Sequence, residues 1–174
     1  TIVYTKGKNP DLDEIYKARK EPIDTNIPLF VWVNRNSASA SEILAGALQD
    51  LDRAVIVGER TFGKGLVQTT RELPYGGSLK VTVAKYYIPS GRCIQSIDYS
   101  NRSEEGYVTR IPDSLTSEFK TKNGRIVRDG GGINPDVQIE IKNHATVSYY
   151  LYQKNLIFNF VTQYMAKHAN IGPA

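Results

Sequence analysis

The chain contains little cysteine, little histidine and no long hydrophobic run. Its single cysteine, Cys93, excludes an intramolecular disulfide. The two histidines, His144 and His168, lack the spacing of a metal site, so no metal is expected. No stretch approaches the roughly 18 apolar residues of a membrane-spanning helix, and residues 1–5 lack the charged and apolar regions of a signal peptide. Neither an export signal nor a membrane segment is therefore predicted in this sequence.

The composition is that of one compact domain. The 174 residues are 40% hydrophobic and 23% charged, enough to bury a core without metal or disulfide support. The net charge of +4 raises the question of nucleic-acid binding. However, the basic residues are spread along the chain and mixed with acidic ones, whereas a nucleic-acid platform is dense in basic and aromatic residues. We therefore expect a solvated surface and no nucleic-acid partner.

Two apolar runs predict buried, parallel strands. Residues 28–33 are an unbroken apolar and β-branched run, as expected of a strand covered on both faces, and residues 54–57 form a second one. Between them, Ser39 and Glu42 have the spacing of a capping box, and apolar residues then recur at helical intervals. The pattern predicts a helix from Ser39 or Ala40 to about Leu51, and hence a right-handed βαβ unit.

A serine on the first turn of such a helix is suited to nucleophilic catalysis. It lies at the carboxyl edge of the sheet, where free helix N–H groups can stabilise an oxyanion. It also needs a base, and neither histidine sits in a motif typical of a triad. Lys64 lies between Gly63 and Gly65 among apolar residues, and a lysine can serve if burial and nearby positive potential lower its pKa to about 7–8. The ordinary alternatives are a capping serine and a solvated loop lysine.

Residues 58–65 also match a phosphate-binding loop at every position but the last. That position needs Ser or Thr to hold magnesium, and a helix must follow. Here Gly65 has no ligand atom, and residues 66–70 favour a strand. Nucleotide binding is therefore not expected.

Patterns elsewhere predict further elements. His168 is expected near the end of the last helix, whose aromatic face is typical of a core or subunit contact. The other predictions are a strand at 2–6, a short strand or helix at 14–18, a hairpin of 66–73 with 78–88, a long loop over 96–117, a second hairpin of 118–121 with 125–128, a tight turn at 130–132, and an amphipathic helix over 146–169 broken near Asn155.

Several of these runs together resemble the carboxyl-terminal processing (tail-specific) serine proteases of family S41. Two separate signature blocks match in order and at the right separation, and the likeness covers about residues 1–141. The blocks are residues 36–50 and 57–68, with further similar stretches at 86–92 and 132–137.

The resemblance implies a role for four residues. Ser39 would be the nucleophile, Lys64 the general base and Gln68 the residue that positions the lysine. The amide of Ala40 would supply one oxyanion-hole donor. Because four residues of an ideal strand span about 13 Å, contact between Gln68 and Lys64 requires a bend at Gly65. An ordinary strand glutamine is the alternative for Gln68.

The resemblance also implies a fold and a domain organisation. The fold is an α/β core similar to the crotonase and Clp peptidase folds, with a βαβ unit, additional β-hairpins and a C-terminal helix. Residues 1–142 would form the catalytic core, and residues 143–174 a helical segment packed on it. The family places a PDZ domain and a glycine-rich turn, which gives the second oxyanion donor, before the matching region. The chain is therefore expected to be a catalytic-core fragment without the PDZ domain.

The function implied is a serine endopeptidase that cleaves proteins near their C-terminus by a Ser-Lys dyad assisted by glutamine. No cofactor is expected. The partners would be proteins or peptides bound through their C-terminal region, and a homo-oligomer is compatible with the resemblance. An extracytoplasmic location, in the periplasm or cell envelope, follows from the resemblance alone. The alternative is a catalytically inactive S41-like binding or assembly module, for which a broken dyad would argue; here both residues are present.

Overall fold

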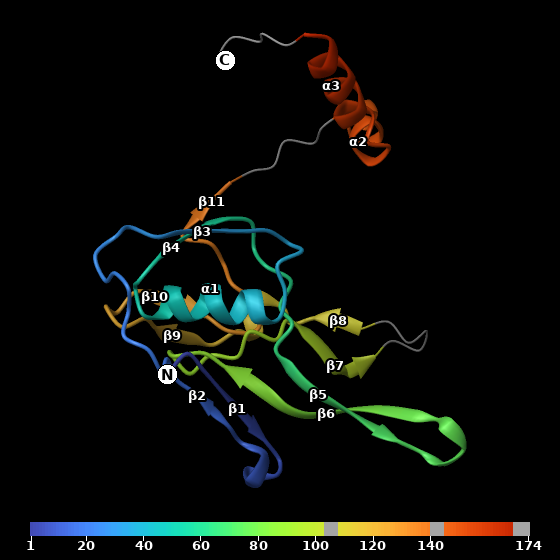
Figure 1. Cartoon of the computed structure of the whole chain (residues 1–174). Coiled ribbons are helices and arrows are strands. Elements are labelled where there is room, and N and C mark those ends of the chain that lie inside the picture. The colour runs from blue at the N-terminus through green and yellow to red at the C-terminus, as the bar shows by residue number, and fades with distance from the viewer. Residues whose placement is uncertain (103–107, 140–144, 169–174) are drawn as a thin grey trace. The chain divides into compact units, whose positions relative to one another are not determined.

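The structure is a computed structural model that describes residues 1–102, 108–139 and 145–168 (Figure 1). It divides into two compact units, Thr1–Glu140 and Ile141–Ala174.

A small parallel sheet and one helix form the centre of the first unit. The strands are β3 (Phe30–Val33), β4 (Val55–Gly58) and β11 (Val137–Gln138), in the order β11-β4-β3. Helix α1 (Ala40–Asp50) connects β3 to β4, which pair in parallel, so the predicted βαβ unit is confirmed. Strand β11 was not predicted, because two residues carry no readable periodicity.

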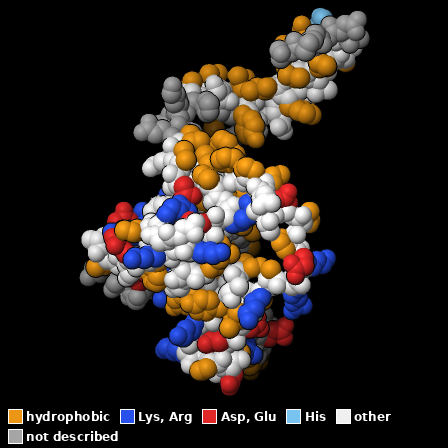
Figure 2. All heavy atoms as spheres, turned by 90° about the vertical axis from the view of Figure 1, so that its left-hand side faces the viewer, with side chains coloured by type: hydrophobic (Ala, Val, Ile, Leu, Met, Phe, Trp, Pro, Cys, Tyr) orange, Lys and Arg blue, Asp and Glu red, His pale blue; other side chains and the backbone are white. Residues whose placement is uncertain are grey.

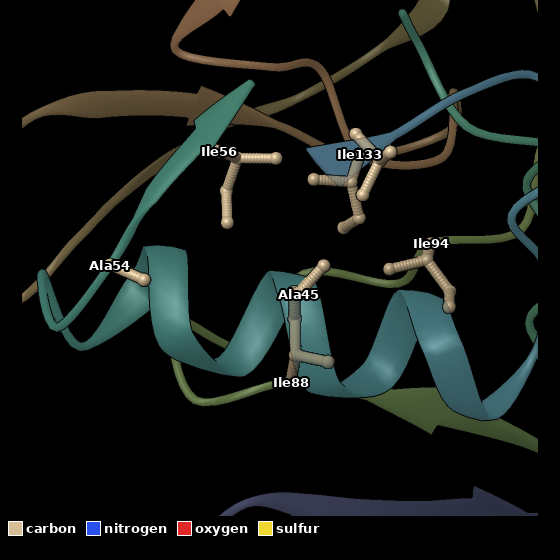
Figure 3. Close-up of a cluster of buried hydrophobic side chains, with 7 residues drawn as sticks. Ala45, Ala54, Ile56, Ile88, Ile94 and Ile133 are labelled. Atoms are coloured by element: carbon tan, nitrogen blue, oxygen red, sulfur yellow. The ribbon is translucent and has the colours of Figure 1, made fainter. Parts of the chain in front are cut away.

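A cluster of aliphatic side chains packs α1 against this sheet (Figure 3). The helix contributes Ala45 and the central strand Ile56, and neither is exposed to solvent. Three completely or almost completely buried isoleucines come from connecting segments later in the chain, namely Ile88, Ile94 and Ile133. The βαβ unit therefore completes its core with residues that follow it in the sequence.

An antiparallel sheet in the order β2-β1-β6-β5 forms the second layer of this unit. The predicted hairpin of β5 and β6 is confirmed, with a register shift between Val67 and Gln68. The ambiguous element at 14–18 is a two-residue strand. The bounds are β1 (Val3–Gly7), β2 (Ile15–Tyr16), β5 (Leu66–Glu72) and β6 (Ser78–Tyr87), with short 3-10 turns η1 (Pro10–Leu12) and η2 (Pro74–Gly76).

Two short hairpins complete the first unit. The predicted hairpin is present as β9 (Glu118–Lys120) and β10 (Ile126–Arg128). The prediction of one long loop over 96–117 is wrong, because β7 (Ile97–Arg102) pairs with β8 (Val108–Arg110) before the turn η3 (Asp113–Leu115). Their sequences are polar and lack the alternation of apolar and polar residues that predicts a strand, because the two strands are held by backbone pairing.

Over residues 145–168, the described part of the second unit, the chain forms two helices, α2 (Thr146–Gln153) and α3 (Leu156–Lys167). Asn155 adopts a left-handed conformation between them, which confirms the predicted break. His168 caps α3 as expected, and its ring stacks on Tyr164 at 4.0 Å. Neither helix contains a buried residue. Packing of this segment on the core stays a prediction, and His144 lies outside the described residues.

The surface mixes charges of both signs. On the face in Figure 2, Lys and Arg side chains are mixed with Asp and Glu over the first unit, and hydrophobic side chains are exposed on both units. In the ranges that the structure describes, no helix has the length and hydropathy needed to cross a bilayer.

Candidate active site

Ser39 occupies a sharp turn between β3 and α1. Its φ of 58° and ψ of −120° belong to the first central position of a type II′ turn, a conformation that residues other than glycine rarely adopt. A strained turn from strand to helix is also how nucleophilic serines are presented above a sheet in hydrolases. Ser39 is half-buried, and Glu42 completes the predicted capping box by accepting its amide at 2.9 Å.

Ala40 is the first residue of α1 and is exposed. The first N–H groups of a helix have no acceptor within the helix, and they carry the positive end of its dipole. The Ala40 amide therefore has the character required of an oxyanion donor.

Lys64 lies in the loop that joins β4 to β5. Gly63 before it has a φ of 87°, and a Cβ there would lie 2.1 Å from Ser96 Oγ, so only glycine fits. The Ser96 amide donates to the Gly63 carbonyl at 2.9 Å, which fixes the loop from one side. Lys64 itself is exposed, so the burial invoked from the sequence is not found in the described part of the chain.

Glu42 joins the serine turn to the lysine loop. Its side chain is completely buried, and Oε2 accepts hydrogen bonds from the amides of Ser39 at 2.9 Å and Lys64 at 2.8 Å. Oε1 accepts the Thr61 hydroxyl at 2.5 Å and the Gly63 amide at 2.6 Å. The sequence indicated only a helix cap at this position. The missed signal was that a carboxylate has lone pairs for several donors, of which a cap uses one.

These bonds also bear on the phosphate-loop alternative. A phosphate would need the loop N–H groups, but those of Gly63 and Lys64 already donate to Glu42. A strand, β5, follows the loop where a helix N-terminus would be required. The loop is therefore built to bind a carboxylate of its own chain.

Gln68 and Lys64 line the same cavity. Its volume is about 290 Å³, and Phe62, Leu66 and Ile97 contribute apolar walls. Gln68 Nε2 donates to Thr82 Oγ1 at 3.5 Å, and the register shift just before Gln68 makes β5 depart from an ideal strand. A second cavity of about 560 Å³ is also lined by Gln68 and Leu66 and extends along the hairpin.

The later stretches that resemble the family, residues 86–92 and 132–137, contact the helix and the strand that carry the site. Asp136 accepts the Ile56 amide at 2.8 Å and the Gln49 side chain at 2.9 Å, which anchors β4 and α1. Arg92 is buried against Asp50 at the end of α1. These residues have structural roles that the sequence alone did not assign.

The described residues hold no group of three or more His, Cys, Asp or Glu side chains that could bind a metal. Cys93 is half-buried in the wall of the larger cavity, and burial raises the pKa of its thiol.

Comparison with known sequences identifies the family. The profile of peptidase family S41 matches residues 1–100, more than half of the chain. The chain belongs to peptidase family S41. A carboxyl-terminal-processing protease of Picosynechococcus sp. is 57% identical over 89 residues, which are 51% of this chain and 21% of that protein. The chloroplastic carboxyl-terminal-processing peptidase 3 of Arabidopsis thaliana is 45% identical over 122 residues, 70% of this chain and 23% of that protein.

A solved structure shares the S41 fold. The photosystem II D1 C-terminal processing protease matches with a TM-score of 0.54 and 36% identity, over 80% of this chain and 27% of that one. The expected α/β fold class is thereby confirmed. This S41 chain spans about a fifth of the length of the curated relatives it matches.

Proposed function

We propose that the intact protein is a serine endopeptidase that cleaves protein substrates near their C-terminus. The observation that carries this proposal is the bonding of one buried carboxylate, Glu42, to the amides of both Ser39 and Lys64. It holds the two S41 signature blocks at one edge of the sheet. The relatives described above are named as carboxyl-terminal-processing enzymes, which supports the substrate class.

The chemistry begins with Ser39 Oγ attacking the scissile carbonyl carbon. Lys64 accepts the hydroxyl proton and returns it to the leaving amine as the peptide C–N bond breaks. The Ala40 N–H stabilises the oxyanion that forms on the carbonyl oxygen. Lys64 then takes a proton from water, which attacks the acyl carbon, and returns that proton to Ser39 Oγ as the ester bond breaks. Gln68 positions the lysine from the wall of their shared cavity.

The substrate chain would run along the cavity that contains Lys64. Its apolar walls, with Phe62, Leu66 and Ile97, suit a hydrophobic side chain of the substrate. The proposed substrate is thus a protein or peptide with an accessible C-terminal segment. Self-association of the intact protein is compatible with this role.

The location proposed is outside the cytoplasm, in the periplasm or cell envelope. Relatives include chloroplastic and bacterial processing enzymes, and the single cysteine places no demand on the redox state of the compartment.

The test is cleavage of a loosely folded protein with an apolar C-terminus by the intact protein and its Ser39→Ala and Lys64→Ala variants. Both variants should lose turnover and keep the unfolding transition of the wild type. Lys120→Ala, which removes an exposed lysine on β9, is the matched control and should cleave normally. Normal rates in Lys64→Ala would exclude the lysine as base. Inactivity of the folded wild type on several such substrates would favour the binding or assembly module.

A further inference from the structure

Glu42 accepts more hydrogen bonds than a helix cap requires. A cap needs only the bond from the Ser39 amide, yet three further donors come from Thr61, Gly63 and Lys64, beyond the next strand. A buried carboxylate is costly unless it is fully hydrogen-bonded, and here each oxygen accepts two bonds.

We infer that Glu42 is a positioning residue of this active site, which sets the place of Ser39 relative to Lys64 through their backbone amides. The inference rests on the proposed function. Both amides donate to the same oxygen, Oε2, so the two chain segments share one reference point. Glu42 does not touch the substrate and takes no part in proton transfer.

The conformation of Ser39 explains why such an anchor is needed. Ser39 has a φ of 58°, and a positive φ at a residue other than glycine is strained and persists only where neighbouring contacts over-determine it. The bond from the Ser39 amide to Glu42 supplies one such contact. On the other side, Lys64 follows Gly63, which has a φ of 87°, and the same carboxylate accepts hydrogen bonds from the amides of both residues.

A backbone hydrogen bond also joins the segment of Ser39 to that of Lys64, and it does not involve the carboxylate. The Phe62 amide donates to the Ser37 carbonyl at 3.0 Å. Loss of the carboxylate is therefore expected to loosen the alignment of Ser39 and Lys64 without separating their segments. A displacement of about 1 Å is sufficient to cost on the order of 100-fold in rate.

Glu42→Gln is the sharpest variant, because it keeps the shape and exchanges one oxygen for an NH2 group. That group donates, so two of the four donors would face another donor. Asp50→Asn is the matched control, since it makes the same acid-to-amide change at a second completely buried carboxylate of the same helix. Glu42→Asp keeps the charge but is one methylene shorter.

The experiment measures kcat and KM on the protein substrate, together with thermal unfolding, for the intact wild type and these variants. Glu42→Gln should lower kcat about 100-fold, with KM changed less than about threefold, at a temperature where it is fully folded. Asp50→Asn should lose stability but keep kcat. Glu42→Asp should recover part of the lost kcat. If Glu42→Gln does not fold, the same contrast between kcat and KM is read in Glu42→Asp.

A second readout does not depend on turnover. Amide hydrogen exchange in the Ser39→Ala background should show loss of protection at Gly63 and Lys64 on adding Glu42→Gln, with β3 and β4 still protected. Wild-type kcat in folded Glu42→Gln, or unchanged protection at Lys64, would overturn the positioning role and leave the protease intact. Hydrolysis that does not depend on Ser39 would instead overturn the proposed function and this inference with it.

Discussion

Arg92 and Asp50 form an ion pair in which both side chains are almost completely buried. Arg92 Nη2 lies 2.8 Å from Asp50 Oδ1, and the side chains are 2% and 0% exposed. Burial lowers the pKa of the Arg92 guanidinium, although Asp50 acts in the opposite direction. Asp50 Oδ2 also accepts the Ser90 amide at 2.9 Å. The pair therefore ties the end of α1 to the segment that follows β6.

Removing one partner of this pair is expected to be strongly destabilising. Asp50→Ala leaves a buried guanidinium without its counter-charge and should lower the free energy of unfolding by about 3–5 kcal/mol. Urea denaturation followed by circular dichroism measures the loss. The control is Asp113→Ala, which breaks the exposed pair with Arg60 and should cost less than about 1 kcal/mol. Equal losses in the two variants would contradict the importance of the buried pair.

The lysine loop offers a comparison between two glycines of nearly equal φ. Gly63 has a φ of 87° and Gly124 a φ of 86°, but a Cβ at Gly63 meets Ser96 whereas that at Gly124 meets nothing within 4 Å. Gly63→Ala should therefore lower the free energy of unfolding by about 1–3 kcal/mol more than Gly124→Ala. Denaturant unfolding of the two variants measures the difference. A similar loss in both variants would show that backbone strain alone, and not the clash with Ser96, determines the loss in the free energy of unfolding.

Gln68 is expected to act on the rate and not on stability. Under the proposed role of Gln68 in positioning Lys64, Gln68→Ala should lower kcat, because the wall of the cavity that both residues line would lose a side chain. Thr70→Ala is the control: it lies two residues further along β5 and pairs with Lys80. Steady-state cleavage by the two variants gives the comparison. Unchanged kcat in Gln68→Ala would assign Gln68 to the strand alone.

The thiol of Cys93 makes stability depend on pH in the alkaline range. Burial raises the pKa of this thiol in the folded chain, so the unfolded state releases its proton first as the pH rises. Stability is then full below the ordinary thiol pKa of about 8.5 and falls above it. Denaturant unfolding across this range should show a steeper decline in the wild type than in Cys93→Ser. Parallel curves would refute the buried thiol as the cause.

The central βαβ unit could be predicted because three local signals agree there. Apolar strands, the capping box of Ser39 and Glu42, and helical periodicity all point to the same structure. The strands β7 and β8 could not be predicted, since Ile97 pairs with Arg110 and Asp98 with Thr109 along a polar sequence. Pairing between distant residues left no local signature.

The candidate site shows the same limit. A motif identified Ser39 and Lys64 as candidates, but it could not reveal that one carboxylate bonds to both. Glu42 had already been explained as a cap, and its contacts with Thr61 and Gly63 arise only when β4 returns beside β3. The spacing of Glu42 from Ser39 reveals its role as a helix cap, whereas its hydrogen bonds to residues 61–64 depend on the fold.

The loop that contains Lys64 is hydrogen-bonded to Ile133, a residue that is added much later during synthesis of the chain. Ile133 donates its amide to Thr61 Oγ1 at 2.7 Å, and its side chain is completely buried in the core. A nascent chain emerges from the ribosome with its N-terminal end first, so Ser39 and Lys64 are exposed long before Ile133 is added. A growing chain that carries both candidate residues does not yet contain the assembled site. Under the proposed function, the order of translation delays assembly of that site until the first unit is nearly complete.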